Sequence, residues 1–167
     1  GLFMSFYPLA SALVAPFSGW LSDKISHRPL TSSGLLLAAL AYVFLSTLNE
    51  ASSSVKTAIL VSLLGVGTAL FQSPNNSSVM GAVPKDRLGI AGGINALFRN
   101  LGMVSGVTLS VSLFTMVTKI NINNLSDSAS LDKALFLKGF RVVLVSAAVV
   151  CLTAAAISLY RNRIPQK

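Results

Sequence analysis

The chain has 167 residues, of which 53% are hydrophobic and 11% are charged, and its formal net charge at pH 7 is +8. Soluble globular domains carry about a quarter of their residues as charged side chains, so this composition excludes that class. The positive charge does not indicate a nucleic-acid-binding protein either, because the basic residues lie between apolar segments and form no face with interleaved aromatic rings. We therefore expect the lipid bilayer as the environment of the chain and no nucleic-acid partner.

Five long stretches of the sequence carry no charged residue: 1–22, 29–49, 57–84, 100–118 and 142–160. A helix needs about 20 apolar residues to cross roughly 30 Å of hydrocarbon. Within lipid the backbone must hydrogen-bond to itself, and these runs are too long and too continuously apolar to be the strands of a barrel. We therefore predict an all-α integral membrane fold with five transmembrane helices. Their expected ranges are 2–21, 30–48, 57–83, 90–118 and 139–160.

Two of these segments, 30–48 and 139–160, are apolar almost throughout. This uniform composition favours lipid-facing, peripheral positions. The segment 2–21 instead contains Pro8 and Pro16, each of which removes a backbone hydrogen bond from a helix. Two interpretations stay open. Either these are ordinary prolines of a membrane helix, which neighbouring helices tolerate, or they bend the helix so that it opens a cavity or acts as a hinge.

A dense polar block interrupts the segment 57–83. Its candidate residues for a cavity or a helix seam are Gln72, Pro74, Asn75 and Asn76. Polar side chains in a membrane are costly unless they find partners or water. The block therefore indicates one of two arrangements. Either it lies near the cytoplasmic end and hydrogen-bonds to neighbouring helices, or it marks a broken or bent helix that lines a polar cavity and offers backbone groups to a substrate.

The segment 90–118 contributes two further candidates for the cavity or seam, Asn95 and Arg99. Arg99 is a charged residue that we place inside a span, where it needs water or a partner. It either reaches the cytoplasmic interface as a structural side chain or lies in a cavity. In the cavity it would bind an anionic group or set the pKa of a carboxylate outside this chain. Gly102 and Gly106 form a Gly-x-x-x-Gly pair, which is typical of close helix packing.

A charge-dense stretch at residues 19–30 connects the first two segments. It resembles the loop motif of the major facilitator superfamily, Gly-x-Leu-Ala-Asp-Arg-x-Gly-Arg-Arg/Lys. The residues that match this motif are Gly19, Leu21, Asp23 and Arg28, with Lys24 in place of the first arginine. The sequence departs from the motif at Ser22, Ser26 and His27. So short a connection makes the two segments antiparallel neighbours.

The resemblance extends over essentially the whole chain. The region from Gly65 to Gly102 resembles the C-terminal half of drug:proton antiporters, in particular the branch with fourteen helices. This resemblance implies that the chain is most of the second six-helix bundle of such a transporter. The first bundle and one further helix would then be absent. This agrees with the first residue, Gly1, which leads us to expect that the chain is a piece of a longer protein. Segments 2–21, 57–83 and 90–118 would line the cavity or the seam between bundles, and the other two would be peripheral.

The resemblance also implies a function. Members of this branch export small organic or drug-like compounds by alternating access, driven by the proton gradient and without a bound cofactor or metal. The expected partners are the bilayer, a small organic substrate and the missing N-terminal bundle. Two alternatives stay open: uptake of a metabolite by another member of the superfamily, and a truncated remnant that transports nothing. We expect no enzyme, because the single histidine lies in the basic connection, away from the serines within the spans.

In the family, the aspartate of the loop motif holds the cytoplasmic side shut. Asp23 is therefore the expected latch, with Lys24 and Arg28 as its ion-pair partners, unless it only fixes the topology of the loop. Cytoplasmic loops of membrane proteins are enriched in basic residues. Such residues are dense at 24–28, 84–89 and 161–167. We therefore expect a multi-pass protein of the cell membrane with its N-terminus outside and its C-terminus in the cytoplasm.

Overall fold

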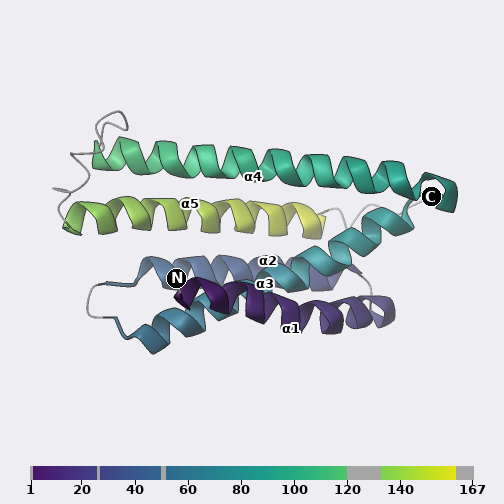
Figure 1. The fold of residues 1–167 in the computed structure, drawn as a ribbon, viewed down its shortest axis with the longest axis horizontal. Coiled ribbons are helices and arrows are strands. Elements are labelled where there is room, and N and C mark those ends of the chain that lie inside the picture. Colours follow the sequence, from purple (N-terminus) through teal and green to yellow (C-terminus); the bar gives the residue numbers. More distant parts are fainter. Residues whose placement is uncertain (1, 26, 50–51, 120–132, 161–167) are drawn as a thin grey trace.

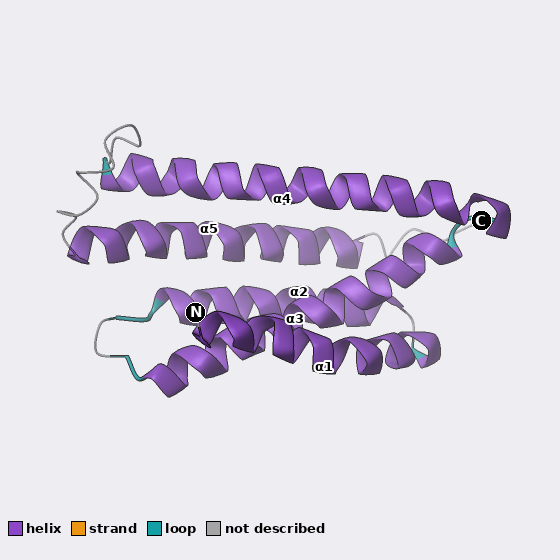
Figure 2. Ribbon diagram, viewed as in Figure 1, coloured by secondary structure: helices purple, strands orange, loops and turns teal. Residues whose placement is uncertain are grey.

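A computed structural model describes residues 2–25, 27–49, 52–119 and 133–160. These residues form five α-helices and one short 3-10 helix, and none of them is in a strand. The elements are α1 (Leu2–Lys24), α2 (His27–Ser46), α3 (Ser54–Gly81), η1 (Lys85–Arg87), α4 (Leu88–Thr118) and α5 (Lys133–Tyr160). The all-α prediction is confirmed, and each of the five expected helices is present (Figure 1, Figure 2).

The connection between the first two helices is shorter than expected. α1 continues to Lys24 and α2 begins at His27, so most of the predicted loop motif is helical. Pro29 does not prevent this, because the first turn of a helix has backbone N–H groups without helical partners, and proline lacks only such a group there. The motif aspartate, Asp23, consequently lies in the last turn of α1.

The helices α2 to α5 all begin earlier than the charge pattern predicts, and the causes are clear for α3 and α5. α3 starts at Ser54, because the side chain of Ser53 accepts a hydrogen bond of 3.3 Å from the backbone N–H of Val55 and caps the helix. α5 starts at Lys133, and its first turns pack on the end of α4: the rings of Phe136 and Phe114 meet edge to face at 5.5 Å. Helical structure therefore extends past the charged residues that bound the apolar runs.

Among the described residues, four helical segments are long and apolar enough to cross a membrane. They are Pro29–Ser46, Ser54–Gly81, Lys85–Thr118 and Lys133–Tyr160. α1 is not in this set. That α1 also spans the membrane stays a prediction.

The five helices lie side by side, in an order that differs from the sequence (Figure 1). α3 packs between α1 and α2, so the expectation that the first two segments are neighbours is wrong, although they are antiparallel. α2 also packs along α5, and α5 packs along α4. Successive helices run in opposite directions, so the α1–α2 connection, η1 and the last residues of α5 gather at one end of the molecule. The α2–α3 connection and the start of α5 lie at the other end.

Two glycines of α3 let this helix approach its neighbours closely. A Cβ atom on Gly65 would lie 2.5 Å from the backbone oxygen of Tyr7 in α1, and one on Gly67 would lie 2.7 Å from the backbone nitrogen of Ala38 in α2. Residues two apart point to opposite sides of a helix. Gly65 therefore permits the close approach of α1, and Gly67 permits that of α2. Gly34 of α2 completes the second contact, since its Cβ would lie 2.8 Å from the oxygen of Gly67.

That the second and fifth segments are peripheral in the complete bundle stays a prediction, but within this chain α2 is not at an edge. The edges of the row are α1 and α4, whereas α2 lies between α3 and α5. In α2, 50% of the membrane-spanning window is buried, against 17% in α3 and 6% in α4. The physical reason is the row of small residues on α2, such as Ala38 and Ala41, which permits close packing on both sides. A hydrogen bond of 2.9 Å between Ser32 and Ser158 also joins α2 to α5.

We predict that Gly67→Ala destabilises the protein, because the added methyl group would meet the backbone of α2 and force the helices apart. The expected loss is about 1–3 kcal/mol, as for other overpacked interfaces, measured as a lower midpoint of thermal unfolding in detergent. Gly93→Ala is the matched control: no described atom lies within 4 Å of its Cβ position, so alanine is neutral there or stabilises α4 by up to about 1 kcal/mol. Equal midpoints for the two variants would contradict the packing described above.

Candidate functional site

The polar block lies on a continuous helix. α3 remains α-helical through Pro74 to Gly81, so the arrangement with a broken helix is not observed. Pro74 is among the largest fully buried side chains in the described structure. It follows Gly67 by two helical turns and therefore lies on the α3 face that contacts α2. Pro74 thus belongs to the packing of the helices and lines none of the cavities described below.

The next residues of the block line a groove between α1 and α3, which we call the α1–α3 groove. Its volume is about 380 Å³. Its lining residues are Ser11, Ala15, Ala69, Gln72, Ser73, Asn76 and Ser77. Every one of these side chains is uncharged, and all except the two alanines can donate or accept a hydrogen bond. The groove is thus a polar surface within an otherwise apolar set of helices.

Contacts between α1 and α3 flank this groove on both sides. Ser11 donates a hydrogen bond of 3.0 Å to the backbone oxygen of Gly65. Two turns further along α1, a Cβ atom on Gly19 would lie 3.3 Å from the Oγ atom of Ser73. The motif glycine Gly19 is therefore a packing residue against α3. Ser22, which is buried, donates to the oxygen of Gly19 at 2.7 Å.

An amide pair connects the polar block to α4. The Nδ2 atom of Asn95 donates to the Oδ1 atom of Asn76 at 3.0 Å. The sequence analysis identified both residues, and the hydrogen bond corresponds to the arrangement in which the block pairs with neighbouring helices. Asn75 points elsewhere and lines a separate cavity of about 500 Å³ between α3 and the start of α4, together with Ser78 and Ala91.

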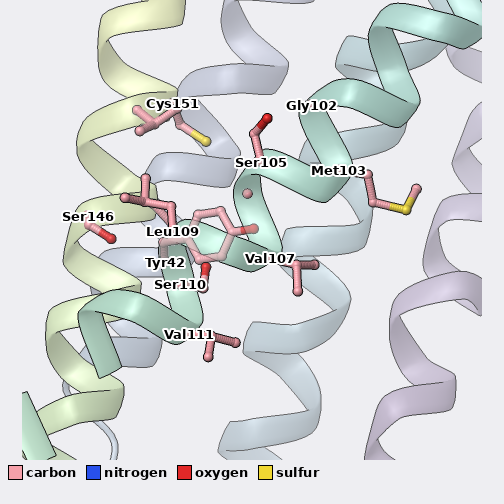
Figure 3. Close-up of a pocket in the computed structure, with 13 residues that line it drawn as sticks. Tyr42, Gly102, Met103, Ser105, Val107, Leu109, Ser110, Val111, Ser146 and Cys151 are labelled. Atoms are coloured by element: carbon pink, nitrogen blue, oxygen red, sulfur yellow. The ribbon is translucent and has the colours of Figure 1, made fainter. Parts of the chain in front are cut away.

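Arg99 and the two glycines that follow it lie outside these polar cavities. Arg99 is exposed, and in the described part of the chain no carboxylate lies within ion-pair distance of it. Gly102 and Gly106 have no described atom within 4 Å of their Cβ positions, so their predicted role in helix packing stays a prediction. They line a third cavity of about 680 Å³ between α4, α5 and α2, which also includes Tyr42 and Cys151 (Figure 3).

The sequence analysis missed Ser11, Ser73 and Ser77 as lining residues of the groove. The signal was present in α1, where small residues recur every three or four positions at Ser11, Ala15, Ser18 and Ser22. Such spacing marks one face of a helix, and in the structure Ser18 and Ser22 are buried while Ser11 and Ala15 line the groove. Among the described side chains, the Oγ atom of Ser18 is buried without a hydrogen-bond partner.

Comparison with known proteins identifies the family. A profile described as Major Facilitator Superfamily matches residues 1–167.

The chain belongs to the major facilitator superfamily.

Several curated members of this superfamily of transporters are similar to the chain. The uncharacterized transporter YebQ of Escherichia coli is 29% identical over 99% of the chain and 32% of its own length. The riboflavin transporter RibZ of Clostridioides difficile is 30% identical over 72% of the chain and 26% of its own length. The multidrug resistance protein Stp of Mycobacterium tuberculosis is 33% identical over 64% of the chain and 20% of its own length. The chain thus spans about a third or less of the length of these relatives, and no solved structure matches it.

The loop motif of the major facilitator superfamily is only partly visible in this member. Gly19 and Leu21 are half-buried residues of α1. The ammonium group of Lys24 lies 3.9 Å from the centre of the Trp20 ring, an interaction that the sequence analysis did not predict. The side chains of Asp23 and Arg28 lie outside the described part of the structure. Their ion pair therefore stays a prediction.

We predict that Asn95→Ala destabilises this superfamily member, because Asn76 loses the amide that satisfies it within the bundle. Hydrogen bonds between membrane helices contribute about 0.6–1.7 kcal/mol, so the thermal midpoint in detergent falls by a few degrees. Thr108→Ala serves as the control, since the Thr108 hydroxyl is exposed and donates only to the oxygen of Val104 in its own helix. If the thermal midpoints of Asn95→Ala and of the control were equal, the hydrogen bond between Asn95 and Asn76 would contribute nothing to stability.

Proposed function

We propose that the chain forms five helices of the second bundle of a secondary active transporter that exports small organic compounds in exchange for protons. The observation that carries this proposal is the α1–α3 groove, an uncharged polar surface of about 380 Å³ between helices of a membrane protein. Sites for small organic ligands measure about 300–1,000 Å³ and combine apolar walls with a few polar groups. Membership of the superfamily and the similarity to a multidrug resistance protein support export.

The chemistry of the groove favours neutral or amphipathic compounds. Gln72 and Asn76 offer amide donors and acceptors, and the serines offer hydroxyl groups, whereas Ala15 and Ala69 supply apolar surface. A substrate in the groove would satisfy polar groups that hydrocarbon cannot. Coupling to protons needs a titratable group, and none of the five acidic residues of the sequence lies in a predicted span. We therefore assign the coupling carboxylate to helices outside these 167 residues.

The gate of this transporter would lie at the α1–α2 connection. Asp23, in the last turn of α1, would pair with Lys24 and Arg28 and with the positively charged N-terminal end of a helix from the other bundle. This contact would hold the cytoplasmic side shut in one of the two states of alternating access. The end of the molecule with the α1–α2 connection and η1 would then face the cytoplasm, and a reporter enzyme fused after Lys167 would be found there.

Uptake of a metabolite is the second candidate function. The similarity to a protein named riboflavin transporter favours it. The same uncharged groove could bind a planar, polar metabolite, so the direction of transport separates the two candidates. The third alternative is a truncated remnant. It would be supported if the chain, co-expressed with the further helices that its relatives possess, transported nothing.

The main test measures ethidium efflux by a complete transporter that contains these helices. In inverted membrane vesicles, an imposed pH gradient is expected to drive ethidium movement. We predict that Gln72→Leu, which keeps the volume and removes the amide, reduces this movement about fivefold, the equivalent of about 1 kcal/mol for one lost hydrogen bond. Thr108→Ala, on the far side of the bundle from the groove, leaves it unchanged. Proton-driven export would be rejected if ethidium movement did not depend on the pH gradient. It would also be rejected if the transporter caused riboflavin to accumulate in cells.

A second test addresses the gate. We predict that Asp23→Asn abolishes transport while the protein level stays normal, because a neutral amide cannot hold the basic residues of the connection. Asp86→Asn is the matched control: Asp86 is exposed in η1, where its carboxylate lies 3.8 Å from the guanidinium of Arg87. Such exposed pairs contribute little, so this variant transports normally. Normal transport by Asp23→Asn would refute the latch.

A further inference from the structure

The cavity of about 500 Å³ between α3 and the start of α4, which we call the α3–α4 cavity, has open polar groups of its own. Its polar side chains are Asn75 and Ser78, and its other walls are apolar residues of α3 together with Ala91 and Ile94 of α4. Both polar side chains are half-buried, and neither has a hydrogen-bond partner among the described residues. Their amide and hydroxyl groups are therefore able to bind a ligand.

The α3–α4 cavity and the α1–α3 groove border the same turn of α3. Asn76 and Ser77, which line the groove, stand in the sequence between Asn75 and Ser78, which line the cavity. Successive residues of a helix point about 100° apart. The two polar spaces therefore open at the same level of α3, on adjacent faces of this helix.

A narrow contact between α3 and α4 separates the two spaces. Asn76 accepts the hydrogen bond of 3.0 Å from Asn95, and among the described residues it is the only hydrogen bond between these two helices. One turn nearer to η1, a Cβ atom on Gly92 would lie 3.5 Å from the Cε atom of Met80. Asn76 also lines the groove, whereas Ile94, which precedes Asn95, lines the cavity. The amide pair thus lies at the boundary between the groove and the cavity.

We infer that the α3–α4 cavity is a second subsite of the substrate site and that Asn95 determines which compounds use it. The inference rests on the proposed function of the groove. While the amides are paired, a compact ligand occupies the groove alone. An elongated amphipathic ligand with hydrogen-bonding groups at both ends displaces Asn95 from Asn76 and reaches both subsites. The freed amide of Asn76 then binds the ligand, and Asn75 and Ser78 bind its far end.

The first test locates two fluorescent dyes in the complete transporter and measures no transport. Every native cysteine, Cys151 included, is changed to serine, and one new cysteine is introduced as Ser77→Cys in the groove or as Ser78→Cys in the α3–α4 cavity. Ethidium, the compact dye, is expected to slow the labelling of Ser77→Cys by N-ethylmaleimide at least threefold and to leave that of Ser78→Cys unchanged. Hoechst 33342, the elongated dye, is expected to slow both. Neither dye changes the labelling of the control Ser54→Cys, at an exposed residue at the other end of α3.

The pattern of protection separates this inference from the proposed function. The inference is overturned if Hoechst 33342 protects only one of the two cysteines, because the two spaces would then not form one site. It is also overturned if ethidium protects both, because the amide pair would then divide nothing. If neither dye protects Ser77→Cys, the groove itself is rejected and the proposed function fails with the inference. The expected pattern without proton-driven ethidium movement would reject the proposed function and leave the two subsites in place.

The second test measures the dissociation constants of the same dyes and addresses Asn95. Asn95→Ala removes the amide that Hoechst 33342 has to displace, so this dye is expected to bind about fivefold more tightly, the equivalent of about 1 kcal/mol, whereas ethidium binding stays within about twofold. Ser78→Ala is expected to weaken Hoechst 33342 about fivefold and to leave ethidium unchanged. A substitution that only loosened the bundle would weaken both dyes alike. Equal changes for the two dyes in either variant would therefore overturn the inference.

Discussion

The close approach of α3 to both of its neighbours determines the arrangement of this chain. Without side chains at Gly65 and Gly67, the backbone of α3 touches the backbones of α1 and α2 on opposite sides. In a bilayer no hydrophobic force pulls apolar helices together, because lipid is equally apolar, so packing and hydrogen bonds must do so. The contact at Gly65 also fixes where α1 lies relative to the next turns of α3. The α1–α3 groove and its amides follow from that placement.

Polar groups in this membrane protein are satisfied in two ways. Many hydroxyl groups donate to a carbonyl of their own helix, as Thr68 does to Leu64 and Thr108 does to Val104. A few hydrogen bonds cross between helices: Ser11 to Gly65, Ser32 to Ser158 and Asn95 to Asn76. Polar surface remains open in the α1–α3 groove and also in the cavity beside Asn75 and Ser78. The polar side chains that line the groove are the basis for proposing it as the substrate site.

The number and type of the helices could be predicted from the sequence, because long uncharged runs have few alternatives in a membrane protein. The position of α2 could not be predicted from its composition. In a wholly apolar helix the side that faces lipid and the side that faces protein are equally apolar, so no periodic pattern separates them. The small residues Gly34, Ala38 and Ala41 were the informative signal. Gln72, Asn76 and Asn95 were recognisable as polar residues in an apolar segment, whereas Ser11 was not, because a single serine is ordinary in a membrane helix.

The order of the helices in space has a consequence for how the protein is made. α1 and α2 are joined by a connection of two residues, yet they touch each other only slightly, because α3 lies between them. A ribosome delivers α1 and α2 to the membrane before α3 has been synthesised. The contacts of Gly34 with Gly67 and Phe71 therefore form only after α3 has entered the membrane. The contacts that hold α1 and α2 in place thus depend on a helix that is synthesised after both of them.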